Sequence, residues 1–127
     1  GAGVIGLEIG SVWARLGADV TIVEFTDNVL NGFDQDVCKE TQKSMQKQGL
    51  KFMLSSKVTA AKAGKDNVVL EIEGKNGTEK MTADKLLVAV GRKANTDKLG
   101  LENIGVKTDQ HGRIEVDSHY QTIAKNI

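Results

Sequence analysis

The sequence predicts an α/β fold in which a parallel sheet with flanking helices joins a three-stranded antiparallel meander, a three-layer ββα arrangement. Three observations predict it. A glycine triplet over residues 1–6 opens a helical stripe that leads to a β-branched strand over residues 19–24. Strand patterns follow over residues 51–82, with apolar residues alternating along residues 68–73, and a continuous apolar run ends at Gly91. Helical, alternating and continuous apolar patterns are typical of amphipathic helices, half-buried strands and central parallel strands, respectively.

The glycine triplet, Gly1, Gly3 and Gly6, has the spacing of a phosphate-binding turn. In such a turn the first glycine permits a tight bend, the second lets the backbone approach a pyrophosphate, and the third lets the helix pack closely on the sheet. The N-terminus of the helix then presents free N–H groups to the anion. Because the chain contains 14 glycines, the triplet alone leaves nucleotide binding and an ordinary turn both open.

The residues after the triplet continue an apolar stripe at helical spacing, formed by Ile9, Val12, Trp13 and Leu16. Gly17 is a natural C-cap, so we expect the helix to end there. Gly10 lies on the same helix face as Gly6. Glycine inside a helix costs about 1 kcal/mol relative to alanine, so this pair predicts very close packing against a sheet or a cofactor.

The strand predicted over residues 19–24 ends in Glu24, at the spacing where the glycine motif expects a carboxylate for the adenosine ribose. Taken alone, such an acid is better explained as a solvated charge at the end of a strand. Joined to the triplet, the helix and the strand, it becomes the favoured ribose ligand. A carboxylate repels a 2′-phosphate, and residues 25–36 contain no Lys or Arg, so the sequence predicts NAD in preference to NADP. Three further acids favour the same choice: Asp27, Asp34 and Asp36.

Length and composition fit one domain over residues 1–127. The 17 basic and 17 acidic side chains cancel, which gives no support to a nucleic-acid or anionic-membrane partner. No run approaches the roughly 18 apolar residues of a membrane span, so we expect a soluble intracellular protein, cytoplasmic or in the mitochondrial matrix. The single cysteine excludes an intrachain disulfide and a cysteine-rich zinc site, and we expect no metal.

The middle of the chain predicts one more helix and then strands. Asp34 can cap a helix that runs to about Gln48 and closes at Gly49. Cys38 lies in its first turn, where a reactive thiol and a passive buried cysteine are both possible, and packing favours the second. Beyond the helix we expect strands over residues 51–54, 58–62, 68–73 and 79–82, with turns at residues 64–67 and 74–77.

The apolar run over residues 86–91 predicts a central parallel strand that is buried on both faces. Gly91 would then lie at the carboxyl end of the sheet, where open α/β sheets bind ligands, although a glycine there can also serve only to end the strand. His111 and His119 have no acid or nucleophile at a useful spacing, so we expect both on the surface.

As a set, these residues resemble the pyridine nucleotide-disulphide oxidoreductases over essentially the whole chain. Residues 1–8, 15–21, 23–25 and 86–92 match motifs shared across that superfamily. The stretches Gly-Ser-Val-Trp at residues 10–13 and Gln-Lys-Gln-Gly at residues 46–49 are similar to its class I branch that oxidises dihydrolipoamide. The resemblance implies a Rossmann-like domain that binds FAD or NAD(P).

The resemblance also implies roles for single residues. Glu24 would hold the adenosine ribose, Val58 would line the adenine side, and Gly91 would approach the cofactor through its backbone. From the residues alone, Val58 is an ordinary core residue and Glu8 an exposed helix charge. The remaining segment would cradle the NAD pyrophosphate, with Glu8 toward the nicotinamide half, and consists of Gly1, Ala2, Gly3, Val4, Ile5, Gly6, Leu7 and Glu8.

For a complete enzyme, the resemblance implies that dihydrolipoamide on the lipoyl domain of a 2-oxo acid dehydrogenase complex is oxidised through a redox-active cysteine pair and FAD. NAD then accepts the hydride, and the enzyme is a homodimer. The cysteine pair and a His-Glu pair that this chemistry needs are absent from these 127 residues. We therefore expect no catalytic residue here, and an inactive NAD-binding domain of a larger flavoenzyme. Its first strand and its FAD domain would lie outside the chain, with residues 113–127 leading back to the latter.

Two alternatives stay open. One is another disulphide or peroxide reductase of the superfamily, such as a glutathione or mercuric reductase, although Glu24 argues against the members that use NADP. The other is a non-catalytic module that binds NAD to bias the conformation of a partner. At Ala94 the sequence departs from many relatives, which have proline there, and the loop should be modestly looser.

Overall fold

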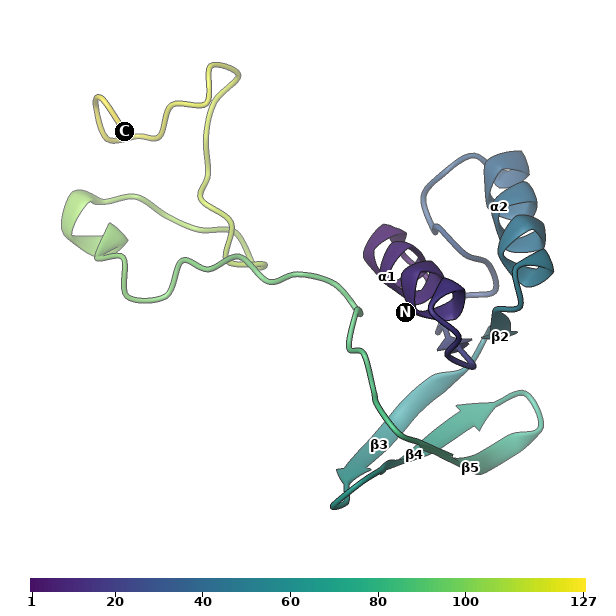
Figure 1. Ribbon diagram of the computed structural model, residues 1–127. Helices are drawn as coiled ribbons and strands as arrows, with labels where there is room; N and C mark the ends of the chain where they lie inside the picture. The colour runs from purple at the N-terminus through teal and green to yellow at the C-terminus, as the bar shows by residue number, and fades with distance from the viewer. The chain divides into compact units, whose positions relative to one another are not determined.

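The computed structural model describes residues 1–127 as two compact units, Gly1–Gly91 and Arg92–Ile127 (Figure 1). The second unit contains one short 3-10 helix, η1 (Leu101–Ile104). The first unit has the predicted mixed α/β composition. Its elements are α1 (Val4–Arg15), β1 (Thr21–Val23), α2 (Gln35–Lys47), β2 (Lys51–Met53), β3 (Lys57–Ala63), β4 (Val68–Gly74) and β5 (Gly77–Ala83).

The strands form two sheets. β1 and β2 pair in parallel, with Ile22 opposite Phe52, and α2 makes the crossover between them. β3, β4 and β5 form the predicted antiparallel meander, in the order β3-β4-β5. The register between β3 and β4 shifts between Val58 and Ala60. The expected fold class is therefore confirmed, and the glycine segment leads directly into α1, which packs beside β1.

α1 packs on the parallel sheet through its glycines. Gly10 is buried, and a Cβ at this position would lie 3.5 Å from Ile22 Cδ1 and 3.6 Å from Val20 Cγ1. Leu7, on the same face, is only 2% exposed. The helix ends at the C-cap Leu16, and Gly17 follows with φ of +96°, a conformation that glycine adopts at little cost. The close packing and the C-terminal end predicted for this helix are confirmed.

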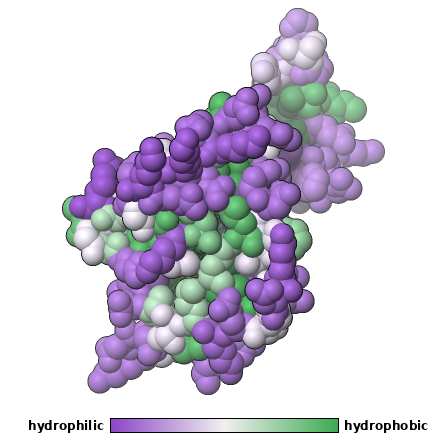
Figure 2. Space-filling model, turned by 90° about the vertical axis from the view of Figure 1, so that its right-hand side faces the viewer, coloured by the Kyte–Doolittle hydropathy of each residue, from purple (hydrophilic) through white to green (hydrophobic).

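The apolar stripe of α1 faces outward, which the sequence did not reveal. The face that carries Leu7 and Gly10 covers the sheet, while the four stripe residues are 37% to 72% exposed: Ile9, Val12, Trp13 and Leu16. Large apolar side chains also reach the surface elsewhere, as the view in Figure 2 shows. This helix has two apolar faces, and only one of them packs on the sheet. The helical period of the apolar residues therefore does not say which face is buried.

α2 begins and ends as predicted. The Asp34 carboxylate accepts hydrogen bonds from the backbone N–H groups of Asp36 (2.9 Å) and Val37 (3.4 Å), and Gly49 has φ of +94° beyond the C-cap. Cys38 is 4% exposed, with its sulfur 3.5 Å from the Leu30 carbonyl oxygen. The passive, buried role of this cysteine is what the structure supports.

The meander buries one face through the alternation predicted for it. Val68, Leu70 and Ile72 of β4 are buried, and Ile72 has no exposed surface. They form a cluster with side chains of the parallel sheet and of β5: Val23, Met53, Met81 and Ala83. Burying these apolar side chains is the main force that holds the meander on the rest of the unit.

The prediction of a strand over residues 86–91 is wrong. The segment forms no ladder, because β1 pairs with β2 alone and no strand lies beside residues 86–91 to accept their hydrogen bonds. Without neighbouring strands its side chains are not enclosed, and four of them are 41% to 80% exposed: Leu86, Leu87, Val88 and Val90. The backbone of Ala89 nevertheless packs against the glycine segment, since a Cβ on Gly1 would overlap the Ala89 carbonyl oxygen.

The unit Arg92–Ile127 consists of turns around η1. Gly100 and Gly105, both with positive φ, bound η1, and Val106 is the buried apolar residue of this unit. The Asp109 carboxylate accepts hydrogen bonds from the N–H groups of His111 and Arg113. Both histidines, His111 and His119, are exposed, as predicted. No helix of the chain has the length and apolar character needed to cross a bilayer.

Candidate nucleotide-binding site

Two of the three glycines lie so close to other backbone atoms that no side chain would fit. A Cβ on Gly6 would overlap the carbonyl oxygen of Gly1, and one on Gly1 would overlap that of Ala89. Gly3, in contrast, is exposed, and a Cβ there would have no heavy atom within 4 Å. The first and third glycines are therefore needed for packing within the protein, and the second leaves open space beside the backbone.

The N-terminus of α1 lies open at this space. The first hydrogen bond of the helix runs from the Leu7 N–H to the Gly3 carbonyl (3.0 Å), so the N–H groups before Leu7 have no partner within the helix. No side chain caps Gly3, and the first turn contains no acid. α2 differs, because Asp34 and Asp36 already occupy its N-terminal end. The positive end of α1 is thus available to an anion such as a pyrophosphate.

Glu24 joins the end of β1 to the glycine segment. Its Oε2 atom accepts a hydrogen bond of 2.6 Å from the Ala2 N–H. Its Oε1 atom accepts two more, from the Thr26 N–H (2.8 Å) and the Thr26 hydroxyl (2.9 Å). Two regions of the chain that the sequence analysis linked only by spacing are therefore in direct contact.

Both backbone polar groups of Ala2, its N–H and its carbonyl, are hydrogen-bonded. While its N–H donates to Glu24, its carbonyl oxygen accepts from the Leu30 N–H at 2.9 Å. Ala2 is 1% exposed, and Leu30 belongs to the same buried cluster. The loop after β1 thus fixes the glycine segment from one side, and Glu24 fixes it from another.

These hydrogen bonds control the charge of Glu24. Partial burial alone would raise the pKa of this carboxyl, but the bonds from Ala2 and Thr26 outweigh it and hold the pKa below its ordinary value of 4.5. Glu24 is therefore an anion at neutral pH. Because residues 25–36 contribute no Lys or Arg, no cation of that loop offsets this charge.

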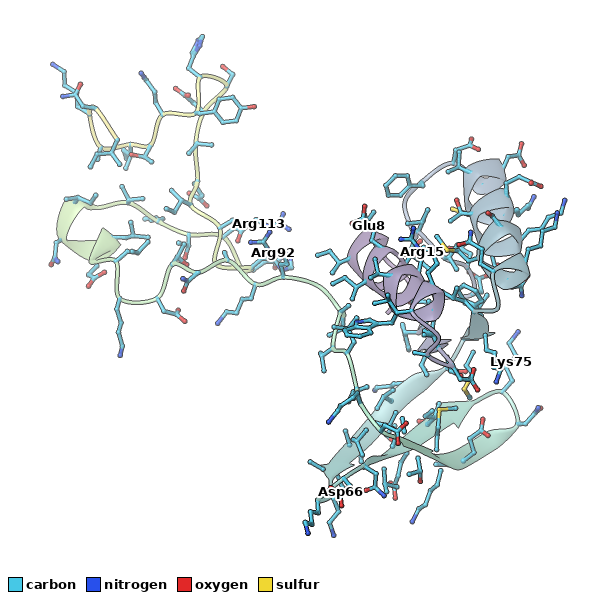
Figure 3. The ribbon with its side chains drawn as sticks, in the orientation of Figure 1. Glu8, Arg15, Asp66, Lys75, Arg92 and Arg113 are labelled. Carbon is cyan, nitrogen blue, oxygen red and sulfur yellow. The ribbon has the colours of Figure 1, made fainter.

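Some of the residues predicted for the site contact one another in the structure, and others do not. Gly1, Ala2, Gly6 and Glu24 form one connected group, with Leu7 buried beneath it. Val4 and Ile5 are 45% and 50% exposed in the first turn of α1. Glu8 points away from α1 into solvent (Figure 3).

Val58 and Gly91 do not join the hydrogen bonds around Glu24. Val58 is 39% exposed and lies at the register shift of β3, so its prediction as a core residue is wrong. Gly91 is exposed and has φ of +128°, a backbone conformation that strongly favours glycine.

Thr26 and Ala89 are residues of the site that the sequence analysis missed. A hydroxyl two residues after an acid is a local signal for a side-chain hydrogen bond, and it could have identified Thr26. Nothing in the sequence pointed to the backbone of Ala89. Another polar feature nearby is Asn28, whose Oδ1 atom is buried without a hydrogen-bond partner.

A hollow lies within the unit Arg92–Ile127. It measures about 970 Å³, and its lining includes Arg92, Lys107 and Arg113. No group of three or more His, Cys, Asp or Glu side chains is placed to hold a metal ion.

The structure is a mixed α/β domain in which the glycine segment and the Glu24 carboxylate are in contact. The sequence matches the family described as pyridine nucleotide-disulphide oxidoreductase over residues 1–127. The chain belongs to this family.

Two similar relatives within this family are dihydrolipoyl dehydrogenases. The chain is 49% identical over 131 aligned residues to the mitochondrial dihydrolipoyl dehydrogenase of Dictyostelium discoideum, covering 100% of this chain and 27% of that enzyme. It is 50% identical over 123 residues to the dihydrolipoyl dehydrogenase of Cupriavidus necator, covering 96% of this chain and 26% of the enzyme. The chain is thus a dihydrolipoyl dehydrogenase-like domain that spans about a quarter of the length of these relatives.

Among solved structures, the chain resembles the HOCl-induced flavoprotein disulfide reductase RclA from Escherichia coli. The TM-score is 0.84 at 29% identity, and the match covers 99% of this chain and 28% of that one. This likeness supports the fold and the membership in a family of flavoprotein oxidoreductases.

Proposed function

We propose that this chain is the NAD-binding domain of a flavoenzyme similar to the dihydrolipoyl dehydrogenases. The observation that carries the proposal is the 2.6 Å hydrogen bond between Glu24 and Ala2, because it joins the carboxylate that we assign to the ribose to the turn that we assign to the pyrophosphate. The identity of about 50% to dihydrolipoyl dehydrogenases over the whole chain supports the same assignment.

The residues of this site would act by binding and orientation. The N–H groups at the start of α1 would receive the pyrophosphate, and the space beside Gly3 would let its oxygens come close to the backbone. Glu24 would accept hydrogen bonds from the hydroxyls of the adenosine ribose. When bound, NAD supplies a nicotinamide ring that can accept a hydride. We further propose that Glu8 lies on the nicotinamide side of the bound NAD and Val58 on its adenine side. The backbone of Gly91 would approach the cofactor.

The preference for NAD over NADP follows from charge. NADP carries a phosphate on the ribose hydroxyl that Glu24 would bind, and two anions at hydrogen-bonding distance repel each other. The low pKa of Glu24 keeps it charged at neutral pH, and the loop over residues 25–36 offers no cation to a phosphate. The exposed acid Asp27 adds to the repulsion.

The wider activity rests on the relatives. In the proposed complete enzyme, dihydrolipoamide on a lipoyl domain of a 2-oxo acid dehydrogenase complex is oxidised through a redox disulphide and FAD bound mainly outside residues 1–127. The enzyme would be a homodimer, and this chain alone would have no turnover. The exposed apolar residues of α1, including Trp13 and Leu16, support a domain that other parts of a larger protein cover.

A second candidate is another disulphide reductase of the family. The structural likeness to the flavoprotein disulfide reductase RclA, with a TM-score of 0.84, favours it. The identity of 29% to that protein, against 49% to the Dictyostelium dehydrogenase, makes it the weaker candidate. A non-catalytic NAD-sensing module would share the site and differ in lacking turnover.

The test is a calorimetric titration of the full-length protein with NAD and with NADP, followed by an assay of NAD reduction by dihydrolipoamide. We expect NAD to bind at least about tenfold more tightly than NADP, and dihydrolipoamide to reduce NAD. Equal binding of the two nucleotides would contradict the role of Glu24. NAD binding without turnover would favour the sensing module, and turnover only with another disulphide substrate would favour the second candidate.

A further inference from the structure

We propose that Thr26 is a positioning residue for the nucleotide: its hydroxyl orients the Glu24 carboxylate and yields one acceptor position to the ribose by turning its proton to Asn28. The inference rests on the proposed NAD site and deepens it.

The first step is the number of acceptor positions on Glu24. A carboxylate offers about four lone-pair positions, two on each oxygen. Oε1 accepts from both the N–H and the hydroxyl of Thr26, so both of its positions are taken. Oε2 accepts from the Ala2 N–H alone. One position therefore remains, whereas an adenosine ribose brings two neighbouring hydroxyls.

The second step is the position of the Thr26 hydroxyl between two acceptors. Its oxygen lies 2.9 Å from Glu24 Oε1 and 2.9 Å from the carbonyl oxygen of Asn28. A hydroxyl has one proton, so it can donate to only one of them at a time. Rotation of the O–H bond exchanges the two without moving any heavy atom. When the proton turns to Asn28, Oε1 can accept from the second ribose hydroxyl.

The third step is what holds the carboxylate during this exchange. The backbone N–H of Thr26 stays bonded to Oε1, and the Thr26 carbonyl accepts from the Ser55 N–H at 2.8 Å. The same loop donates the Leu30 N–H to the carbonyl of Ala2. The hydroxyl therefore ties residue 26 either to the Glu24 side chain or to the Asn28 backbone, and so stiffens either the carboxylate or the loop that fixes the glycine segment.

The expected consequence is a loss of NAD affinity in Thr26→Val, which keeps the shape of the side chain and removes the donor. With ribose bound, the hydroxyl donates to Asn28 and no longer to Glu24. The loss in Thr26→Val therefore comes from the missing bond to Asn28 and from a loop and carboxylate that binding must order, and it corresponds to about two- to tenfold weaker binding. Thr26→Ser keeps the hydroxyl and should bind NAD within about twofold of the unsubstituted protein. Thr82→Val, on the exposed surface of β5, is the matched control and should change nothing.

The test uses the full-length protein, with calorimetric titrations of NAD and of ADP-ribose, which carries the same adenosine ribose without nicotinamide. The Glu24 carboxyl is titrated in parallel by NMR with ¹³C-labelled glutamate. We expect Thr26→Val to weaken both ligands equally and to raise the pKa of Glu24, and Thr26→Ser to restore both quantities.

Three outcomes would overturn the inference. Unchanged affinity in Thr26→Val would remove the role of the hydroxyl, and equal weakening in Thr26→Ser would show a loss of packing instead of a hydrogen bond. A weakening without any change in the Glu24 pKa would show that the hydroxyl does not act through this carboxylate. Failure of the unsubstituted protein to bind NAD at all would instead refute the proposed function, so the two failures are distinguishable.

Discussion

The Oε2 atom of Glu24 lies 2.6 Å from the backbone nitrogen of Ala2, although 22 positions separate the two residues in the chain. This hydrogen bond ties the end of β1 to the segment that leads into α1. A carboxylate in this position affects the glycine segment even before any ligand is bound. Substitutions at either end should therefore change both the stability of the first unit and its affinity for a dinucleotide.

The pair Gly6→Ala and Gly3→Ala should separate packing from binding. A Cβ at Gly6 overlaps the Gly1 carbonyl, so we expect the free energy of unfolding to fall by about 1–3 kcal/mol, as in overpacked sites, together with NAD affinity. A Cβ at Gly3 meets nothing within 4 Å, so stability should hardly change while NAD binding weakens. Urea denaturation and NAD titration of both variants provide the measurement. Equal stability of the two variants would show that the Gly6 contact is unimportant.

Stability should depend on pH through Glu24. Its pKa in the folded protein is lower than its ordinary value of 4.5, so the unfolded state binds the proton more readily. The contribution of Glu24 is therefore complete above about pH 4.5 and is lost as the pH falls through the lower, folded pKa. We expect Glu24→Gln to flatten this part of the stability curve, measured by urea denaturation at a series of pH values. An identical acid dependence in both proteins would argue against the prediction.

Ile72→Ala should destabilise the meander. Ile72 has no exposed surface and packs with Leu70, Val23 and Met53, so its truncation leaves a cavity. Such substitutions cost about 2–5 kcal/mol in free energy of unfolding. Thr78→Ala, at an exposed position of β5, is the control and should stay within about 0.5 kcal/mol of the unsubstituted protein. Chemical denaturation of the two variants measures both values, and a cost below about 1 kcal/mol at Ile72 would contradict this packing.

Trp13 provides a test of the proposed place of this chain in a larger enzyme. The side chain is 55% exposed in residues 1–127. If other parts of the enzyme cover α1, Trp13→Ser should lower the midpoint of thermal unfolding of the full-length protein, because buried apolar area is lost. Lys43→Ser on the exposed surface of α2 serves as the comparison. A midpoint that does not change in Trp13→Ser would indicate that this face of α1 stays open to solvent.

Elements defined by local signals could be predicted from the sequence. Asp34 and Gly49 fixed the ends of α2, and the alternation around Leu70 predicted β4 correctly. The spacing of Glu24 from the glycine triplet singled out this acid, and the structure has it hydrogen-bonded to Ala2. In each case the information lies in short stretches of sequence or in a motif whose spacing has a physical reason.

Features that depend on a distant neighbour could not be predicted. The apolar run over residues 86–91 has the composition of a central strand, but a strand needs partners on its edges, and none lies beside it here. The burial of Leu7 and Gly10 in place of the Trp13 face depends on where the sheet lies. The contact of Ala89 with the glycine segment is made by backbone atoms, which leave no mark on the sequence.

The most direct test of the central claim is the affinity of the full-length protein for NAD and NADP before and after Glu24→Ala, with Glu79→Ala on β5 as the control. Hydrogen bonds to a charged group contribute about 1.5–3 kcal/mol, so Glu24→Ala should weaken NAD by about ten- to a hundredfold. The same change should weaken NADP less, because it also removes a repulsion. NAD affinity that is the same in Glu24→Ala and Glu79→Ala would contradict the assignment of Glu24 as the ribose ligand of an NAD site.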